Sequence, residues 1–75
     1  MNQHTLLFFG PLRDKFGVSE MVIEMPENSD VEHLLVHLDI DSNLVKVAVN
    51  GAIVPVSTKL PMDSEIALLP PVSGG

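Results

Sequence analysis

The sequence has no cysteine, no tryptophan and no tyrosine, and only four of its 75 residues are lysine or arginine. Without cysteine the chain has no disulfide, no thiolate ligand for a metal and no thiol nucleophile, which suits a reducing compartment. Ten acidic residues give a formal net charge of -6. The chain therefore offers no basic surface for nucleic acid, and the cations that bind an anionic substrate must come from a partner.

Long hydrophobic runs are also missing. No stretch approaches the ~20 apolar residues that span a bilayer. Residues 1–5 contain neither a basic residue nor the apolar run of a signal peptide. We expect a cytoplasmic protein without membrane association, and a chain of this length makes one domain with a thin core.

The apolar pattern predicts a small α+β domain with one main helix. Val31 starts a stripe at i, i+3, i+4 and i+7 that ends at Leu38, which predicts a helix of about ten residues. Ser29 and Glu32 fit a capping box at its start. Residues 12–18 are expected to form a loop. Strands are expected over residues 5–9, 20–25, 46–49, 52–54 and 65–69.

Asn50-Gly51 predicts a hairpin, because a type I′ turn needs positive φ at both central residues. A two-residue turn fixes the register and places Ala48 opposite Ile53. These two residues then lie on the face of the sheet away from Val47 and Val49. We expect the helix to cover the face that carries the two valines.

One helix leaves the other face of the sheet open, and exposed apolar patches usually mark interfaces. Ile53 belongs to this open face by the hairpin register. Alternation along the first and last strands adds one residue of each pair to the patch. The pairs are Phe8 or Phe9, and Leu68 or Leu69.

The chain ends Pro70-Pro71-Val72-Ser73-Gly74-Gly75. Glycine has no Cβ, so this end can pass through a narrow channel and leaves its last carbonyl unhindered. The Gly75 carboxylate is therefore a candidate reactive group. The two prolines end the last strand and stiffen the base of the segment, which reaches about 20 Å when extended. We expect a domain over residues 1–69 and an extended tail over residues 70–75.

Two histidines are spaced for a metal, since His33 and His37 lie i, i+4 on the predicted helix. Protein zinc sites normally use three or four ligands. No third ligand accompanies the pair, which falls opposite the apolar stripe. We expect a solvated helix face and no metal site.

Four segments together resemble the small subunits of molybdopterin synthase, which are sulfur carriers with the ubiquitin-like β-grasp fold. The most specific is the last strand running into Leu69-Pro70-Pro71-Val72-Ser73-Gly74-Gly75. One departure is the turn before that strand, where the family usually has a glycine and this chain has Ser64. The four segments are residues 8–14, which begin Phe8-Phe9-Gly10-Pro11-Leu12-Arg13, residues 31–38, residues 47–51 and residues 65–75.

The resemblance implies a mixed sheet with one main helix on one face and a protruding Gly-Gly tail. An ATP-dependent enzyme would adenylate Gly75, and sulfur from a persulfide would replace AMP to leave a thiocarboxylate. The chain would then be a non-catalytic, sulfur-donating subunit that binds no cofactor or metal itself. It would deliver sulfur to a cyclic pyranopterin precursor and so form the molybdopterin dithiolene, with the catalytic residues on the large subunit.

The resemblance also implies the binding surface. The partners would be the large synthase subunit, in a heterotetramer of two small and two large subunits, and the adenylating enzyme. The large subunit would dock on a hydrophobic patch, which selects Phe9 and Leu69 beside Ile53. It would also hold the tail, whose residues Pro70, Pro71, Val72, Ser73 and Gly74 precede the reactive Gly75.

Two alternatives remain open at this point. One is a ubiquitin-like sulfur carrier that serves thiamin, cysteine or tRNA thiolation, because those carriers also end in Gly-Gly. The other is a protein modifier that is conjugated to target lysines through Gly75.

Overall fold

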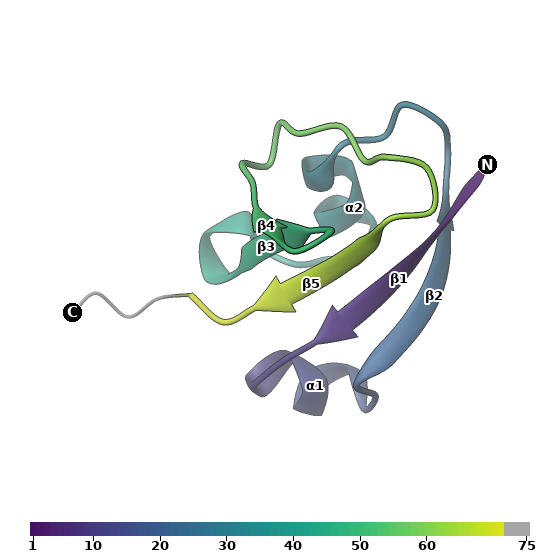
Figure 1. Cartoon of the computed structure of the whole chain (residues 1–75). Helices are drawn as coiled ribbons and strands as arrows, with labels where there is room; N and C mark the ends of the chain where they lie inside the picture. Colours follow the sequence, from purple (N-terminus) through teal and green to yellow (C-terminus); the bar gives the residue numbers. More distant parts are fainter. Residues whose placement is uncertain (72–75) are drawn as a thin grey trace.

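The computed structural model describes residues 1–71, which form one mixed sheet with helices at its face and end (Figure 1). The strand order is β2-β1-β5-β3-β4. The central pair β1 and β5 is parallel, and the other neighbours are antiparallel. The elements are β1 (Asn2–Phe8), α1 (Pro11–Phe16), β2 (Glu20–Met25), α2 (Val31–His37), the 3-10 helix η1 (Ser42–Leu44), β3 (Lys46–Val49), β4 (Ala52–Ile53) and β5 (Glu65–Leu69). No helix within residues 1–71 is long and apolar enough to cross a membrane.

The core lies between α2 and one face of the sheet, as the predicted α+β architecture requires (Figure 1). The helix buries Val31, Leu34 and Leu35. Each such side chain contributes about 1.5–3 kcal/mol when it leaves water. The sheet supplies the opposite wall with Leu6, Phe8, Val47, Val49, Ile66 and Leu68, all buried.

The start of α2 differs from the predicted capping box. Asp30 is the N-cap, and its carboxylate accepts the backbone N–H of His33 at 2.8 Å. Ser29 is buried one residue earlier and donates its hydroxyl to the carbonyl of Pro26 at 2.6 Å. The helix ends at His37 with Leu38 as its C-cap, so it has seven residues and not ten.

A second short helix replaces the loop predicted over residues 12–18. Pro11 opens α1, where the missing N–H of proline costs nothing and its fixed φ suits a helix. Gly10 precedes it at φ 60° and ψ −138°, and Gly17 ends it in the left-handed region. Phe16 stacks on Phe8 with ring centroids 4.7 Å apart, so α1 is tied to β1.

The hairpin prediction is confirmed. Ala48 pairs with Ile53, and the turn residues Asn50 and Gly51 both have positive φ. The Asn50 side chain also accepts the N–H of Glu65 at 2.9 Å, which ties the turn to the start of β5. The strands expected at 20–25, 46–49 and 65–69 match, and β4 ends one residue short of the expected 52–54. β1 starts three residues earlier than expected and ends before Phe9.

The turn before β5 contains Ser64 in place of the glycine that the resemblance implies, and a neighbouring residue takes the positive φ. Positive φ falls on Asp63, at 51°, and not on Ser64. Ser64 is buried, and its hydroxyl lies 2.8 Å from Nδ1 of the buried His4 in β1. The backbone N–H of Ser64 donates to the same nitrogen at 3.3 Å, which requires an unprotonated Nδ1.

This contact predicts a stability that falls in mild acid. Burial lowers the pKa of His4 below its ordinary 6.5, although the charge of Asp63 opposes the shift. Below about pH 6.5 the unfolded chain therefore binds a proton that the folded chain resists, so stability declines as pH falls. Urea unfolding at pH 7.5 and 5.5 should show a larger loss for the parent than for His4→Gln. His37→Gln on the exposed surface of α2 is the control, and an equal pH dependence in all three proteins would contradict the prediction.

Candidate functional site

The tail leaves the domain from the middle of the sheet, because β5 lies between β1 and β3. Pro70 and Pro71 follow Leu69 directly and are both exposed. The backbone N–H of Phe9 donates to the carbonyl of Leu68 at 3.2 Å, so the chain after β1 runs beside the end of β5. The predicted site residues Val72, Ser73, Gly74 and Gly75 lie outside the described residues.

The open face of the sheet carries an apolar row that crosses four strands. Leu7 pairs with Ala67, Ala67 with Ala48, and Ala48 with Ile53. Glu20 on β2, paired with Leu7, ends the row with a charge. A second, shorter row lies nearer the tail, where Phe9 follows β1 and Leu69 pairs with Lys46 of β3. The six apolar residues of the two rows, here called the open-face patch, are Leu7, Phe9, Ala48, Ile53, Ala67 and Leu69.

The structure decides between the residue pairs that alternation left open. Phe8 and Leu68 are buried in the core beneath α2, whereas Leu69 is half-buried. Phe9 is 43% exposed and Ile53 is 60% exposed. The structure thus brings the three predicted partner-binding residues of the domain onto one surface, with Phe9 and Leu69 at the tail and Ile53 across the sheet.

Charged residues border this surface, with Glu20 paired to Leu7 and Lys46 paired to Leu69. Within residues 1–71 no group of three histidines or carboxylates is placed to hold a metal ion. His33 and His37 are both exposed on α2, on the opposite side of the sheet from the open-face patch. The described residues therefore offer an apolar contact surface at the base of the tail.

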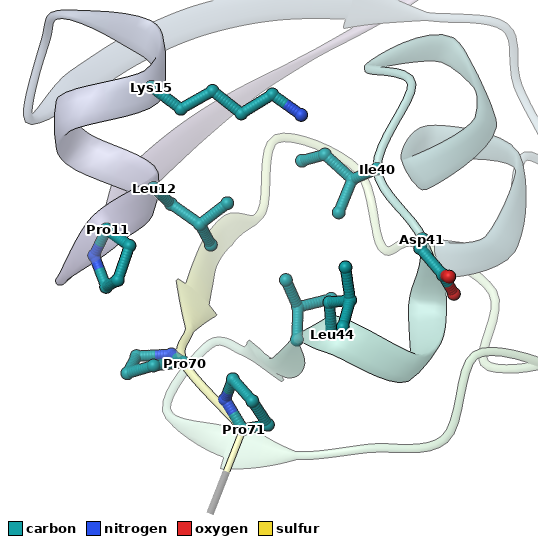
Figure 2. Close-up of a pocket in the computed structure, with 9 residues that line it drawn as sticks. Pro11, Leu12, Lys15, Ile40, Asp41, Leu44, Pro70 and Pro71 are labelled. Atoms are coloured by element: carbon teal, nitrogen blue, oxygen red, sulfur yellow. The ribbon is translucent and has the colours of Figure 1, made fainter.

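A cavity of about 310 Å³ lies on the other side of the tail base (Figure 2). The sequence does not predict this cavity, because its walls come from α1, from residues 40–45 and from the two prolines. Ile40 and Val45 are buried at its inner end, while Leu44 remains 61% exposed. No pattern in the sequence marked this cavity, because Leu44 stands outside the apolar periods of the expected helix and strands. We call this hollow the tail-base cavity.

Comparisons with known proteins agree with this architecture. A family model described as the ThiS family matches residues 6–75, and no curated protein matches the chain. A molybdopterin converting factor subunit 1 from Pyrococcus furiosus is 26% identical with a TM-score of 0.82, covering 96% of this chain and 100% of that chain.

Two further solved structures are similar. One is the protein-protein complex of subunits 1 and 2 of the molybdopterin-converting factor from Helicobacter pylori. A chain of this complex matches at 25% identity and a TM-score of 0.67, over 97% of this chain and 99% of that chain. The small archaeal modifier protein 1 from Haloferax volcanii shares the fold at 18% identity and a TM-score of 0.83, over 96% and 100%. The likenesses confirm the ubiquitin-like β-grasp fold.

Proposed function

Because the chain belongs to the ThiS family, whose model matches residues 6–75, we propose that it is the sulfur carrier subunit of molybdopterin synthase. The observation that carries the proposal is an apolar patch, with Phe9 and Ile53 as its exposed residues, that ends at the base of a Gly-Gly tail. Two of the similar structures, at 25% and 26% identity, are molybdopterin converting factors. This likeness favours molybdopterin over thiamin, cysteine or tRNA thiolation.

The tail carries the chemistry in this proposal. An adenylating enzyme joins the Gly75 carboxylate to the α-phosphate of ATP and releases pyrophosphate, which turns a poor electrophile into a mixed anhydride. A persulfide sulfur displaces AMP, and a thiol then cleaves the sulfur–sulfur bond to leave the Gly75 thiocarboxylate. ATP is thus a substrate of the activating enzyme and not a ligand of this chain.

The large subunit completes the reaction. Its cationic residues hold the anionic precursor, since this chain has a net charge of -6. A dithiolene contains two sulfur atoms, and each charged tail brings one. Two carriers are therefore used for each product, which accords with an assembly of two small and two large subunits. This exchange takes place in the cytoplasm.

Each part of the chain has a physical role. The open-face patch docks on a partner, because burial of apolar surface favours association without fixing the reaction. Pro70 and Pro71 restrict the backbone at the tail base, which lowers the entropy lost when the tail is inserted. Gly74 has no side chain to obstruct a channel, and Gly75 bears the sulfur.

Intact mass spectrometry tests the proposal directly. The purified chain, incubated with the adenylating enzyme, ATP and a persulfide donor, should gain the mass of one sulfur-for-oxygen exchange at its C-terminus. The same mixture without ATP is the control. Subsequent addition of the large subunit and the precursor should reverse the gain and yield molybdopterin. Ladders of conjugates on lysine side chains, without a thiocarboxylate, would instead identify a protein modifier.

A further inference from the structure

The tail-base cavity forms a second apolar surface that the open-face patch does not include (Figure 2). Leu12 of α1 and Leu44 of η1 project into it from two sides, and Pro70 and Pro71 close a third side. Leu44 is exposed and Leu12 is half-buried, and the hollow of about 310 Å³ between them leaves room for one or two large side chains. Nothing in residues 1–71 fills this space.

The tail-base cavity adjoins the open-face patch at the point where the tail leaves the domain. Pro70 lies against Gly10, since a Cβ built on Gly10 would be 3.4 Å from Cγ of the proline. Phe9 of the open-face patch immediately precedes Gly10, and Leu69 immediately precedes Pro70. The tail base is therefore flanked by apolar surface on both sides. A protein that encloses the chain beyond Pro71 must pass over the prolines that form the cavity wall.

Two charged residues of opposite sign lie at the mouth of the cavity. The Lys15 side chain extends across one rim, as Figure 2 shows. Asp41 lies on the opposite rim, but its Oδ1 already accepts the N–H of Asn43 at 2.9 Å as the cap of η1. An incoming group therefore meets charges of both signs beside apolar walls. Asp41 is held in place as the cap of η1, whereas Lys15, with Nζ 5.8 Å from the Phe16 ring centroid, can pair with an incoming carboxylate.

We propose that the tail-base cavity receives an aliphatic or aromatic side chain of the large synthase subunit that takes up the tail, next to a carboxylate of that subunit that pairs with Lys15. This inference rests on the proposed function, because the tail must enter a partner for that partner to cover Pro70 and Pro71. The partner then contacts the tail base on two sides, at the tail-base cavity and at the open-face patch. Such two-sided contact fixes the direction in which the tail enters the partner.

Leu44→Asp tests the cavity, because this side chain is largely exposed in the isolated chain and its replacement should leave the thermal melt nearly unchanged. Calorimetric titration against the large synthase subunit should show affinity reduced about tenfold to a hundredfold, as for a central apolar contact. Lys15→Glu should weaken binding by a smaller factor and remove part of its salt dependence. Met62→Asp is the matched control. Its side chain is 73% exposed and precedes β5, whereas the cavity lies beyond the end of that strand.

A chain without residues 72–75 separates this inference from the proposed function. If that truncation binds the large subunit as the parent does, the tail base is not enclosed by that subunit and the cavity proposal is overturned, whereas the proposed function fails only if the full-length chain never forms the Gly75 thiocarboxylate. If truncation weakens binding while Leu44→Asp binds like Met62→Asp, only the cavity proposal is overturned. Sedimentation of the isolated chain supplies a further check. A dimer that Leu44→Asp dissociates would make a second copy the occupant and would also overturn the proposal.

Discussion

Removal of Gly75 is expected to abolish sulfur transfer while the domain stays folded. The reacting carboxylate would move to Gly74, one residue short of the position that an activating enzyme and a synthase must reach. An extended residue spans about 3.3–3.6 Å, and a misplacement of only 1 Å can cost about a hundredfold in rate. The core consists of residues between Leu6 and Leu68, so the melting temperature should not change.

Molybdopterin formation in the reconstituted system is the measurement. A chain with one alanine added after Gly75 should be equally inactive, because its new carboxylate is displaced by the same distance in the other direction. Gly74→Leu keeps the length and should reduce activity by obstructing the channel. Sustained molybdopterin production by the shortened chain would falsify the sulfur-carrier proposal.

Ile53→Asp is expected to weaken binding to the large subunit by several kcal/mol and to leave the isolated domain almost as stable as the parent. Ile53 is 60% exposed, so an aspartate there remains hydrated in the free chain. In the complex the same carboxylate would be stranded in an apolar contact without a partner. Phe9→Asp should behave in the same way, because Phe9 is also exposed on the open-face patch.

Leu35→Asp is the control variant, for which we expect unfolding and not a selective loss of binding. Leu35 is 1% exposed in the core, and an aspartate there must be buried without a counter-ion. The expected cost of several kcal/mol approaches the whole stability of a small domain, so the chain should unfold. Thermal melts paired with binding titrations decide the matter. Unfolding of the Ile53→Asp monomer, or its normal binding to the large subunit, would show that the open face has been misassigned.

The hairpin and β5 could be predicted because their signals are local. Asn50-Gly51 sets both the turn and the register, and Pro70-Pro71 ends the last strand. The register in turn assigned Ile53 to the open face before any tertiary contact was known. The domain boundary at residue 69 and the roles assigned to the tail remain predictions.

The start of α2 could not be predicted from local signals, because distant segments compete for its first turn. The N–H of Val31 donates to the carbonyl of Thr58 at 3.0 Å, and that of Glu32 to Val56 at 2.9 Å. These bonds satisfy donors that a capping box serves in other helices. Ser29 was therefore free to bond backward to Pro26, and the cap moved to Asp30.

A helix as short as α1 and a cavity built from several segments also have only weak signals in the sequence. α1 has six residues and no side-chain cap, so no apolar period distinguishes it from a turn. The tail-base cavity needs α1, η1 and the two prolines to meet. Only the strand order brings them together, and a parallel pairing of β1 with β5 has no local signal.

The parallel pairing of β1 with β5 also determines when the domain can fold during synthesis of the chain. Thr5 pairs with Glu65, and His4 contacts Ser64, which is 60 residues away in the chain. Contacts of such long range make folding slow and force it to wait for the last strand. A nascent chain therefore completes its core only when β5 has left the ribosome, just ahead of the tail. Termination before β5 yields no folded core, so the open-face patch does not assemble without the strand that carries Ala67 and Leu69.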